Sequence, residues 1–218
     1  YSFKLHFQHE GLKKIFSLMG PILISTWVQP INAMVNIRLA SYLNEGKAVA
    51  ALDYANKLYV IVVGVFIYGL TNLIFPSLSR ISAGNDKEQL AKLLHRSLKT
   101  VLFFIFPLMV GMILLRIPLI QLIYERGEFD SVSTQLTSTA LLFYSIGMVA
   151  FSFQEVLNKA FYAMQDSSTP MKIAVAGITV NIILSFTLVR FMGIGGLALA
   201  SSIAAIFIAI LLLKAIQK

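Results

Sequence analysis

The sequence has no cysteine and few charged residues. Without cysteine the chain can form no disulfide, no cysteine-ligated zinc site and no thiolate nucleophile. Only 13% of its 218 residues are charged, whereas an ordinary soluble domain carries about 25%. In contrast, 57% of the residues are hydrophobic and the mean hydropathy is +0.79. Polar side chains are too scarce to cover a water-facing surface, so the composition indicates a membrane protein.

Motifs for enzyme chemistry are also missing from the sequence. It contains no glycine-rich phosphate loop, no HExxH pattern and no GxSxG pattern. The three histidines, His6, His9 and His95, lie in polar segments, and no apolar run contains a pair of carboxylates. We therefore predict that the chain is not an enzyme, and that it has neither a metal centre nor a cofactor.

The net charge of +8 raises the question of nucleic-acid binding. A nucleic-acid-binding protein gathers its basic residues on one soluble face. Here they form short clusters between long uncharged runs, which is typical of membrane proteins whose Lys and Arg fix their orientation. We predict no nucleic-acid partner. With the N-terminus inside, the outer segments hold only six of the 18 Lys and Arg residues, namely Arg38, Lys47, Lys57, Arg116, Arg126 and Arg190. This bias places both termini in the cytoplasm.

The spacing of the charges predicts six membrane-spanning helices. A helix needs about 20 apolar residues to cross the hydrocarbon core, and the uncharged runs place spans at about 12–43, 48–83, 88–115, 131–164, 169–191 and 194–216. The apolar run 117–124 is too short to span and predicts a short segment at the outer face. Residues 1–10 are predicted to form a cytoplasmic linker. The fold class is therefore all-α, a polytopic six-transmembrane-helix bundle.

The start of the chain suggests that it is a fragment. It begins at Tyr1 without an initiator Met, and the polar stretch that follows has no apolar core of a signal peptide. We expect membrane-spanning sequence to be missing upstream.

Several polar residues interrupt the apolar helices. Asn32 and Asn36 lie one turn apart in the first span, as do Asn181 and Ser185 in the fifth, and Ser201 lies in the sixth. Hydrogen bonds between helices would explain them. A small cation site is the alternative, because hard cations bind several oxygen ligands. The sequence leaves both readings open.

Charged residues and prolines in or beside the spans are further candidates. Glu155 and Lys159 stand at i, i+4, the favourable order for a structural ion pair on a helix. Asp53 and Lys57 share this spacing, but Lys57 precedes 22 uncharged residues, and its ammonium is predicted to face an aqueous cavity and an anionic substrate. Arg38 is a second candidate for substrate binding. Pro30 either acts as a hinge or is one of the prolines common in membrane helices.

Four phrases resemble the MviN/MurJ family of bacterial lipid II flippases, which belongs to the multidrug/oligosaccharidyl-lipid/polysaccharide exporter superfamily. These phrases are LDYANKL, GLTNLIFPSLSRISAGND, LIYERGEFD and ALLFYSIGMVAFSFQEVLNKAFYAMQDSSTPMKIA. The resemblance extends from about Gly11 to Lys218. It implies two six-helix lobes around a central cavity, with this chain as the second lobe and the first lobe of the same protein missing.

The resemblance also implies a function and a location. The protein would flip lipid II, the undecaprenyl-pyrophosphate-linked peptidoglycan precursor, across the bacterial plasma (inner) membrane by alternating access, for cell wall synthesis and cell shape. Its partners would be lipid II, membrane lipids and the first lobe. Transport would be coupled to Na⁺ or to the membrane potential.

Individual residues take roles from the same resemblance. Lys57 stands where the family has a cavity arginine thought to engage the pyrophosphate, and it keeps the charge without the bidentate fork. A sodium site in one relative uses the seventh, eleventh and twelfth helices, and by position Asn181, Ser185 and Ser201 match it, with Asn32 or Asn36. Two alternatives stay open: an exporter of polysaccharide-lipid or drugs, and a membrane scaffold without transport.

Overall fold

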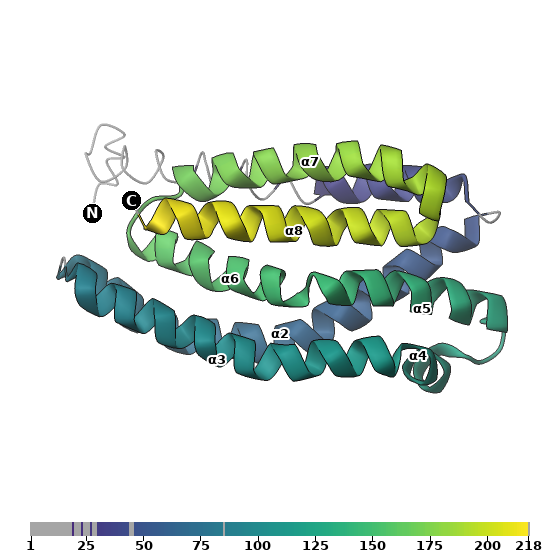
Figure 1. Cartoon of the computed structure of the whole chain (residues 1–218), viewed down its shortest axis with the longest axis horizontal. Coiled ribbons are helices and arrows are strands. Elements are labelled where there is room, and N and C mark those ends of the chain that lie inside the picture. The colour runs from purple at the N-terminus through teal and green to yellow at the C-terminus, as the bar shows by residue number, and fades with distance from the viewer. Residues whose placement is uncertain are drawn as a thin grey trace, which may run out of the picture.

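The structure, a computed structural model, describes residues 19, 23, 27, 30–43, 46–84 and 86–217. Every regular element in this part of the chain is a helix, as Figure 1 shows, so the predicted all-α class is confirmed. After a helix over 30–41, the chain forms α2 (Lys47–Ala83), α3 (Lys87–Leu114), α4 (Arg116–Tyr124), α5 (Ser131–Ile146), α6 (Met148–Ala163), α7 (Ser168–Met192) and α8 (Ile194–Ile216).

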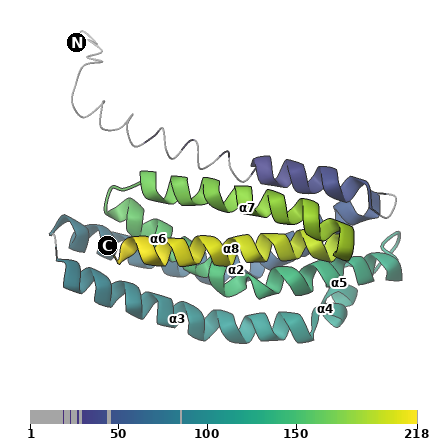
Figure 2. The same ribbon diagram turned by 45° about the horizontal axis from the view of Figure 1, so that its top comes forward.

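The long helices run side by side in layers (Figures 1 and 2). The antiparallel pair α7 and α8 forms one layer, α5 and α6 follow one another end to end in the next, and α2 and α3 lie beyond them. On α2, the small buried side chains Ala48, Ala51 and Ala55 allow α5 to pack closely.

Four helices in the described part of the chain are long and apolar enough to cross a membrane: α2, α3, α7 and α8. Helices α5 and α6 pass the same test together, as one span with a bend of 51°. The predicted span at 12–43 lies largely outside the described residues, and only its helical part over 30–41 can be followed. The apolar run at 117–124 forms the short helix α4.

The region predicted as one span, 131–164, is divided into two helices at Gly147. The amide of Gly147 donates to the carbonyl of Tyr144, three residues back, so the α-helical ladder is interrupted. The hydroxyl of Ser202 on α8 donates to the carbonyl of Phe143 at 2.5 Å, and also lies 3.4 Å from the carbonyl of Tyr144. A side chain from another helix thus supplies a donor where the ladder fails. Charge spacing could not reveal this break.

A tight turn at Gly193 joins α7 to α8. Gly193 has a φ of 53°, in the left-handed region that glycine adopts without strain. A Cβ on Gly196 would lie 2.4 Å from the carbonyl oxygen of Leu188, so the backbones of the two helices approach as closely as a glycine allows. Ala198, Ala200 and Ala204 are further small side chains that are buried along α8 and permit close helix packing.

The loop between α4 and α5 is held by side chains that the LIYERGEFD phrase supplies. Tyr124 and Phe129 pack on the ring of Tyr54 in α2, at centroid distances of 4.8 and 5.6 Å. Thr134 donates to the carboxylate of Glu125 at 2.7 Å, and Gly127 has a φ of 60°. The loop is therefore a structural clamp on α2.

Asp130 caps the helix that follows this loop. Its carboxylate accepts from the amide of Ser133 at 2.8 Å and pairs with Lys47 of α2 at 3.0 Å. Hydrogen bonds from Ser133 and the pair with Lys47 hold the pKa of this exposed Asp130 carboxyl well below its usual range. The first turns of α2 and α5 are thereby tied together outside the spans.

Candidate functional site

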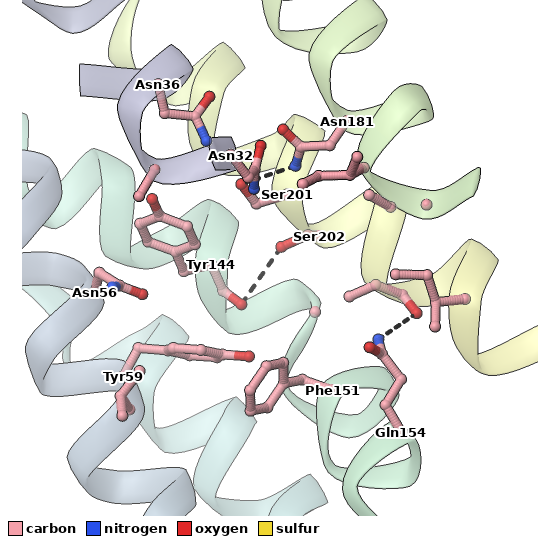
Figure 3. Close-up of a pocket in the computed structure, with 18 of the residues that line it drawn as sticks. Asn32, Asn36, Asn56, Tyr59, Tyr144, Phe151, Gln154, Asn181, Ser201 and Ser202 are labelled. Carbon is pink, nitrogen blue, oxygen red and sulfur yellow. Dashed lines mark hydrogen bonds between the residues drawn. The ribbon is translucent and has the colours of Figure 1, made fainter. Parts of the chain in front are cut away.

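A cavity of about 950 Å³ lies between the helix over 30–41, α2 and the α5 to α8 bundle. Polar and aromatic side chains face it, and the close-up in Figure 3 shows Tyr59, Tyr144 and Phe151 near one another, with Asn56 beside Tyr59 and with Asn181 in a separate group of amides and hydroxyls. Its lining includes Asn32, Asn36, Asp53, Asn56, Tyr59, Tyr68, Tyr144, Gln154, Glu155, Asn158, Asn181, Ser201 and Ser202. A cavity with this lining can hold water or a polar group within an apolar bundle.

Of the five polar residues singled out in the sequence, all but Ser185 line this cavity, and Ser185 lies within hydrogen-bond distance of two of them. The hydroxyl of Ser185 lies 3.0 Å from Oδ1 of Asn36 and 3.1 Å from Oδ1 of Asn181. Nδ2 of Asn181 donates to Oγ of Ser201 at 3.2 Å. Asn32 lies beside them in Figure 3. Side chains of α7 and α8 are thus joined to the helix over 30–41 by hydrogen bonds.

Asn32 differs from its neighbours in this network. Its Oδ1 atom is buried and has no hydrogen-bond partner within the described residues. A buried amide oxygen without a donor is costly, by about 1–3 kcal/mol. The network is therefore incomplete at the point where Asn32 meets the cavity.

The donor set of this network fits a cation only in part. Amide and hydroxyl oxygens are the hard ligands that Na⁺ and similar cations prefer. However, the cluster contains no carboxylate, and no group of three or more His, Asp or Glu that could hold a metal occurs within the described ranges. The oxygens are present, while the negative charge that would strengthen binding is not.

Lys57 and Arg38 do not line the cavity. Nζ of Lys57 lies 2.6 Å from the carboxylate of Asp53, as the i, i+4 spacing suggested, and Asp53 does face the cavity. The Lys57 side chain is 60% exposed, and its ammonium lies 6.0 Å from the centre of the Tyr54 ring. Arg38 is exposed on the helix over 30–41, one residue after Ile37, which is part of the lining. Both cations therefore lie at the rim of the cavity, next to residues that line it, and are not part of the lining themselves.

The predicted ion pair between Glu155 and Lys159 is wrong. The ammonium of Lys159 lies over the ring of Phe75, 5.5 Å from its centre, and none of the ion pairs in the described part of the chain contains Glu155. The favourable spacing sets the two side chains on one face, but the ammonium of Lys159 contacts the ring of Phe75 in α2 instead. The carboxylate is left at the cavity.

Pro30 is the first residue of the helical run over 30–41, and residues 28 and 29 lie outside the described part of the chain. Its role as a hinge therefore stays a prediction.

Sequence reasoning missed the wall formed by α2, α5 and α6. Tyr59 stacks with Tyr144 at 5.8 Å and meets the edge of Phe151 at 5.7 Å. Gln154 donates from Nε2 to the carbonyl of Ala205 on α8 at 2.7 Å. The signal used for the Asn and Ser residues, a polar side chain within an apolar run, also applies to Gln154. The tyrosines gave no comparable signal, because aromatic residues in spans are usually core.

Comparisons with known proteins agree with this architecture. The family described as "Lipid II flippase MurJ" matches residues 1–218. The probable lipid II flippase MurJ of Rickettsia prowazekii is 30% identical over 200 residues, which cover 92% of this chain and 39% of the relative. The chain thus spans about two fifths of the length of that curated relative.

Solved structures give the same result for the fold. A structure of the lipid II flippase MurJ in an inward-closed conformation has a TM-score of 0.81 and 31% identity, covering 100% of this chain and 45% of that one. The MATE transporter VcmN of Vibrio cholerae, in its bent form, has a TM-score of 0.84 at 17% identity, covering 98% of this chain and 49% of that one. The likeness to VcmN shows the fold alone. The match over the whole chain places it in the lipid II flippase MurJ family.

Proposed function

We propose that this chain forms the second six-helix lobe of a lipid II flippase, which moves the lipid-linked peptidoglycan precursor across the bacterial plasma membrane by alternating access. The observation that carries the proposal is the cavity between apolar helices whose lining includes many polar side chains, in a chain whose whole length matches the family. A diphosphate-sugar headgroup needs such a polar path, because crossing hydrocarbon without one leaves its charges unsolvated. The first lobe, with its own six helices, would complete the cavity.

The pair of Lys57 and Asp53 supports a role for Lys57 in binding the pyrophosphate. Both side chains are more than half exposed, at 60% and 54%, and an exposed pair of this kind contributes only about 0–1 kcal/mol. Lys57 can therefore leave Asp53 for a more highly charged phosphate group at little cost. Asp53, which lines the cavity, then keeps the lysine at its rim when no cargo is bound. Arg38 is a second rim cation on the facing helix.

The orientation follows from the basic residues rather than from the structure. With both termini in the cytoplasm, most Lys and Arg residues lie on the inner side. Lys57 and Arg38 then lie toward the outer side, where they would meet the headgroup as it leaves.

We expect Lys57→Ala to reduce lipid II flipping in proteoliposomes by about tenfold or more, because a charge-assisted hydrogen bond to phosphate contributes about 1.5–3 kcal/mol. The variants are made in a full-length protein that carries residues 1–218 as its second lobe. Lys57→Arg should retain most of the activity, since it keeps the charge and adds a fork that suits phosphate.

Lys47→Ala is the matched control for this experiment. Lys47 is also an exposed lysine on α2 paired with an aspartate, but its partner Asp130 lies outside the cavity lining, whereas Asp53, the partner of Lys57, is part of it. Substitution of Lys47 should leave flipping within about twofold of wild type, since an exposed pair contributes little. Equal activity of Lys57→Ala and wild type would remove Lys57 from the site, and a wild type that does not flip lipid II would remove the proposed function.

For coupling, we propose that the oxygens of Asn32, Asn36, Asn181, Ser185 and Ser201 are the group that would hold a sodium ion. Amide and hydroxyl oxygens from three helices meet there, and Oδ1 of Asn32 has a free lone pair. A bound ion would supply positive charge that draws the three helices together. The membrane potential is the alternative driving force.

We expect Asn181→Leu, which keeps the size of the side chain, to lower the free energy of unfolding by about 1–2 kcal/mol, because it breaks buried hydrogen bonds between helices. Thr187→Val on the same helix is the control, since Thr187 is exposed and bonds only to carbonyls of its own helix. Thermal unfolding in detergent, with and without Na⁺, measures both effects. A rise in stability with Na⁺ that Asn181→Leu abolishes supports the cation site, and no rise in wild type contradicts it.

A further inference from the structure

Glu155 is an intramembrane carboxylate that the proposed function does not use. It lies in α6, eight residues before the end of that helix at Ala163, or about 12 Å along the axis at 1.5 Å per residue. Its side chain is partly buried and faces the cavity. An ionisable residue at such a depth is expensive to keep and usually functional.

No cation forms an ion pair with Glu155 within the described residues. The ammonium of Lys159, one turn further along α6, lies over the Phe75 ring. Nε2 of the neighbouring residue Gln154 donates a hydrogen bond to the carbonyl of Ala205. The carboxylate is thus left with the cavity and its contents as partners.

The titratable groups around Glu155 are mostly phenols. Helix α6 packs against α2, α3, α5, α7 and α8. From α2, Tyr59 and Tyr68 interact electrostatically with Glu155, and Asp53 lines the same cavity. Tyr144 of α5 and Tyr162 of α6 line it too, whereas the described residues of α3, α7 and α8 contribute no titratable side chain to the lining. Lys159 is the one cation whose charge acts on Glu155.

An unpaired carboxylate in such a place has two ways to avoid the cost of a buried charge, which amounts to several kcal/mol per ion in proteins. It can bind a metal ion or it can bind a proton. A metal ion requires several hard ligands, and within the described ranges no second or third acidic or histidine side chain stands close enough to complete such a group. A proton requires only the carboxylate itself.

We propose that Glu155 is a proton-binding site of the cavity. The carboxylate is charged while water from one side of the membrane fills the cavity, and it takes a proton from that water, forming an O–H bond, when the cavity closes and dries. Opening to the other side returns the proton to water. This proposal rests on the proposed alternating-access function and adds a proton to its cycle.

The first experiment detects the proton without requiring transport. Infrared difference spectra of the full-length protein in lipid nanodiscs are recorded as the pH falls, and the carbonyl band of a protonated carboxylic acid is followed. We expect part of this band to be lost in Glu155→Gln. It should be retained in Glu88→Gln, because Glu88 has the same spacing to a lysine but is exposed and ion-paired with Lys92 at 2.6 Å. A band that Glu155→Gln leaves unchanged, or one that Na⁺ removes at constant pH, overturns the proposal.

The second experiment measures coupling. A pH gradient across proteoliposomes should change the flipping rate of wild type and Glu88→Gln severalfold, and should have no effect on Glu155→Gln. Glu155→Asp, which keeps a titratable group, should restore part of the response. If Glu155→Gln responds as wild type does, the proton site is wrong although flipping stands. If wild type does not flip lipid II but the infrared band still depends on Glu155, the proposed function fails and the proton site is supported.

Discussion

Replacing Gly196 by alanine is expected to destabilise the protein by about 1–3 kcal/mol, toward the upper end of that range. The added Cβ would lie 2.4 Å from the carbonyl oxygen of Leu188 and 2.9 Å from the amide nitrogen of Val189, both backbone atoms. No side-chain rotation relieves such a contact, so α7 and α8 must separate at their turn. Thermal unfolding in detergent, followed by circular dichroism, measures the loss.

Gly69→Ala is the control for this substitution. Gly69 lies inside α2, and a Cβ there would meet nothing within 4 Å. Because alanine is favoured over glycine in a helix by about 0.5–1 kcal/mol, this variant should be as stable as wild type or slightly more stable. If both substitutions had the same effect, the close backbone approach at Gly196 would not be what holds the hairpin.

Gly147→Ala is expected to change the bend between α5 and α6 and to slow flipping. The new Cβ would lie 2.7 Å from Oγ of Ser202 and 3.0 Å from its Cα. It therefore displaces the hydroxyl that donates to the carbonyl of Phe143 and pushes α8 from the break. We expect a loss of about 1–3 kcal/mol in stability, as for other overpacked contacts, and a reduced flipping rate in proteoliposomes.

A second substitution tests whether the contact with Ser202 causes this effect. Ser202→Gly removes the Cβ and Oγ that collide with the new methyl group, so the double variant should lose less stability than the two single losses together. Ser202→Ala alone removes the hydrogen bond without a collision, and should cost about 1 kcal/mol. Additive losses in the double variant would show that Gly147 acts through something other than α8.

The sequence was sufficient to predict the class of fold because membrane crossing constrains it strongly. Uncharged runs bounded by Lys and Arg correspond to α2, α3, α7 and α8, since few other patterns supply about 20 apolar residues in a row. The break at Gly147 was not predictable, because a glycine in an apolar run is common. The carbonyl of Phe143, which is free at this break, accepts from a hydroxyl in a segment 55 residues beyond Gly147 along the chain.

The Asn and Ser residues of the candidate site were predictable from the sequence, whereas the surroundings of Glu155 were not. Asn36 and Asn181 were recognisable because amides are rare in apolar helices, and the i, i+4 spacing put Asn181 and Ser185 on a shared face. The spacing rule failed at Glu155, where it predicted an ion pair. Whether two residues on one helix form an ion pair also depends on the side chains of neighbouring helices. Here the ammonium of Lys159 lies over the ring of Phe75.

The aromatic clamp formed by Tyr54, Tyr124 and Phe129 has a consequence for exchanging parts between relatives. Tyr54 stands one turn before Lys57 on α2, while the other two rings belong to the end of α4 and its loop. A chimera that receives the loop of another family member without the residue at position 54 would join two surfaces that did not evolve together. The transferable module is therefore discontinuous: it consists of the loop and one turn of a helix about 70 residues earlier in the chain.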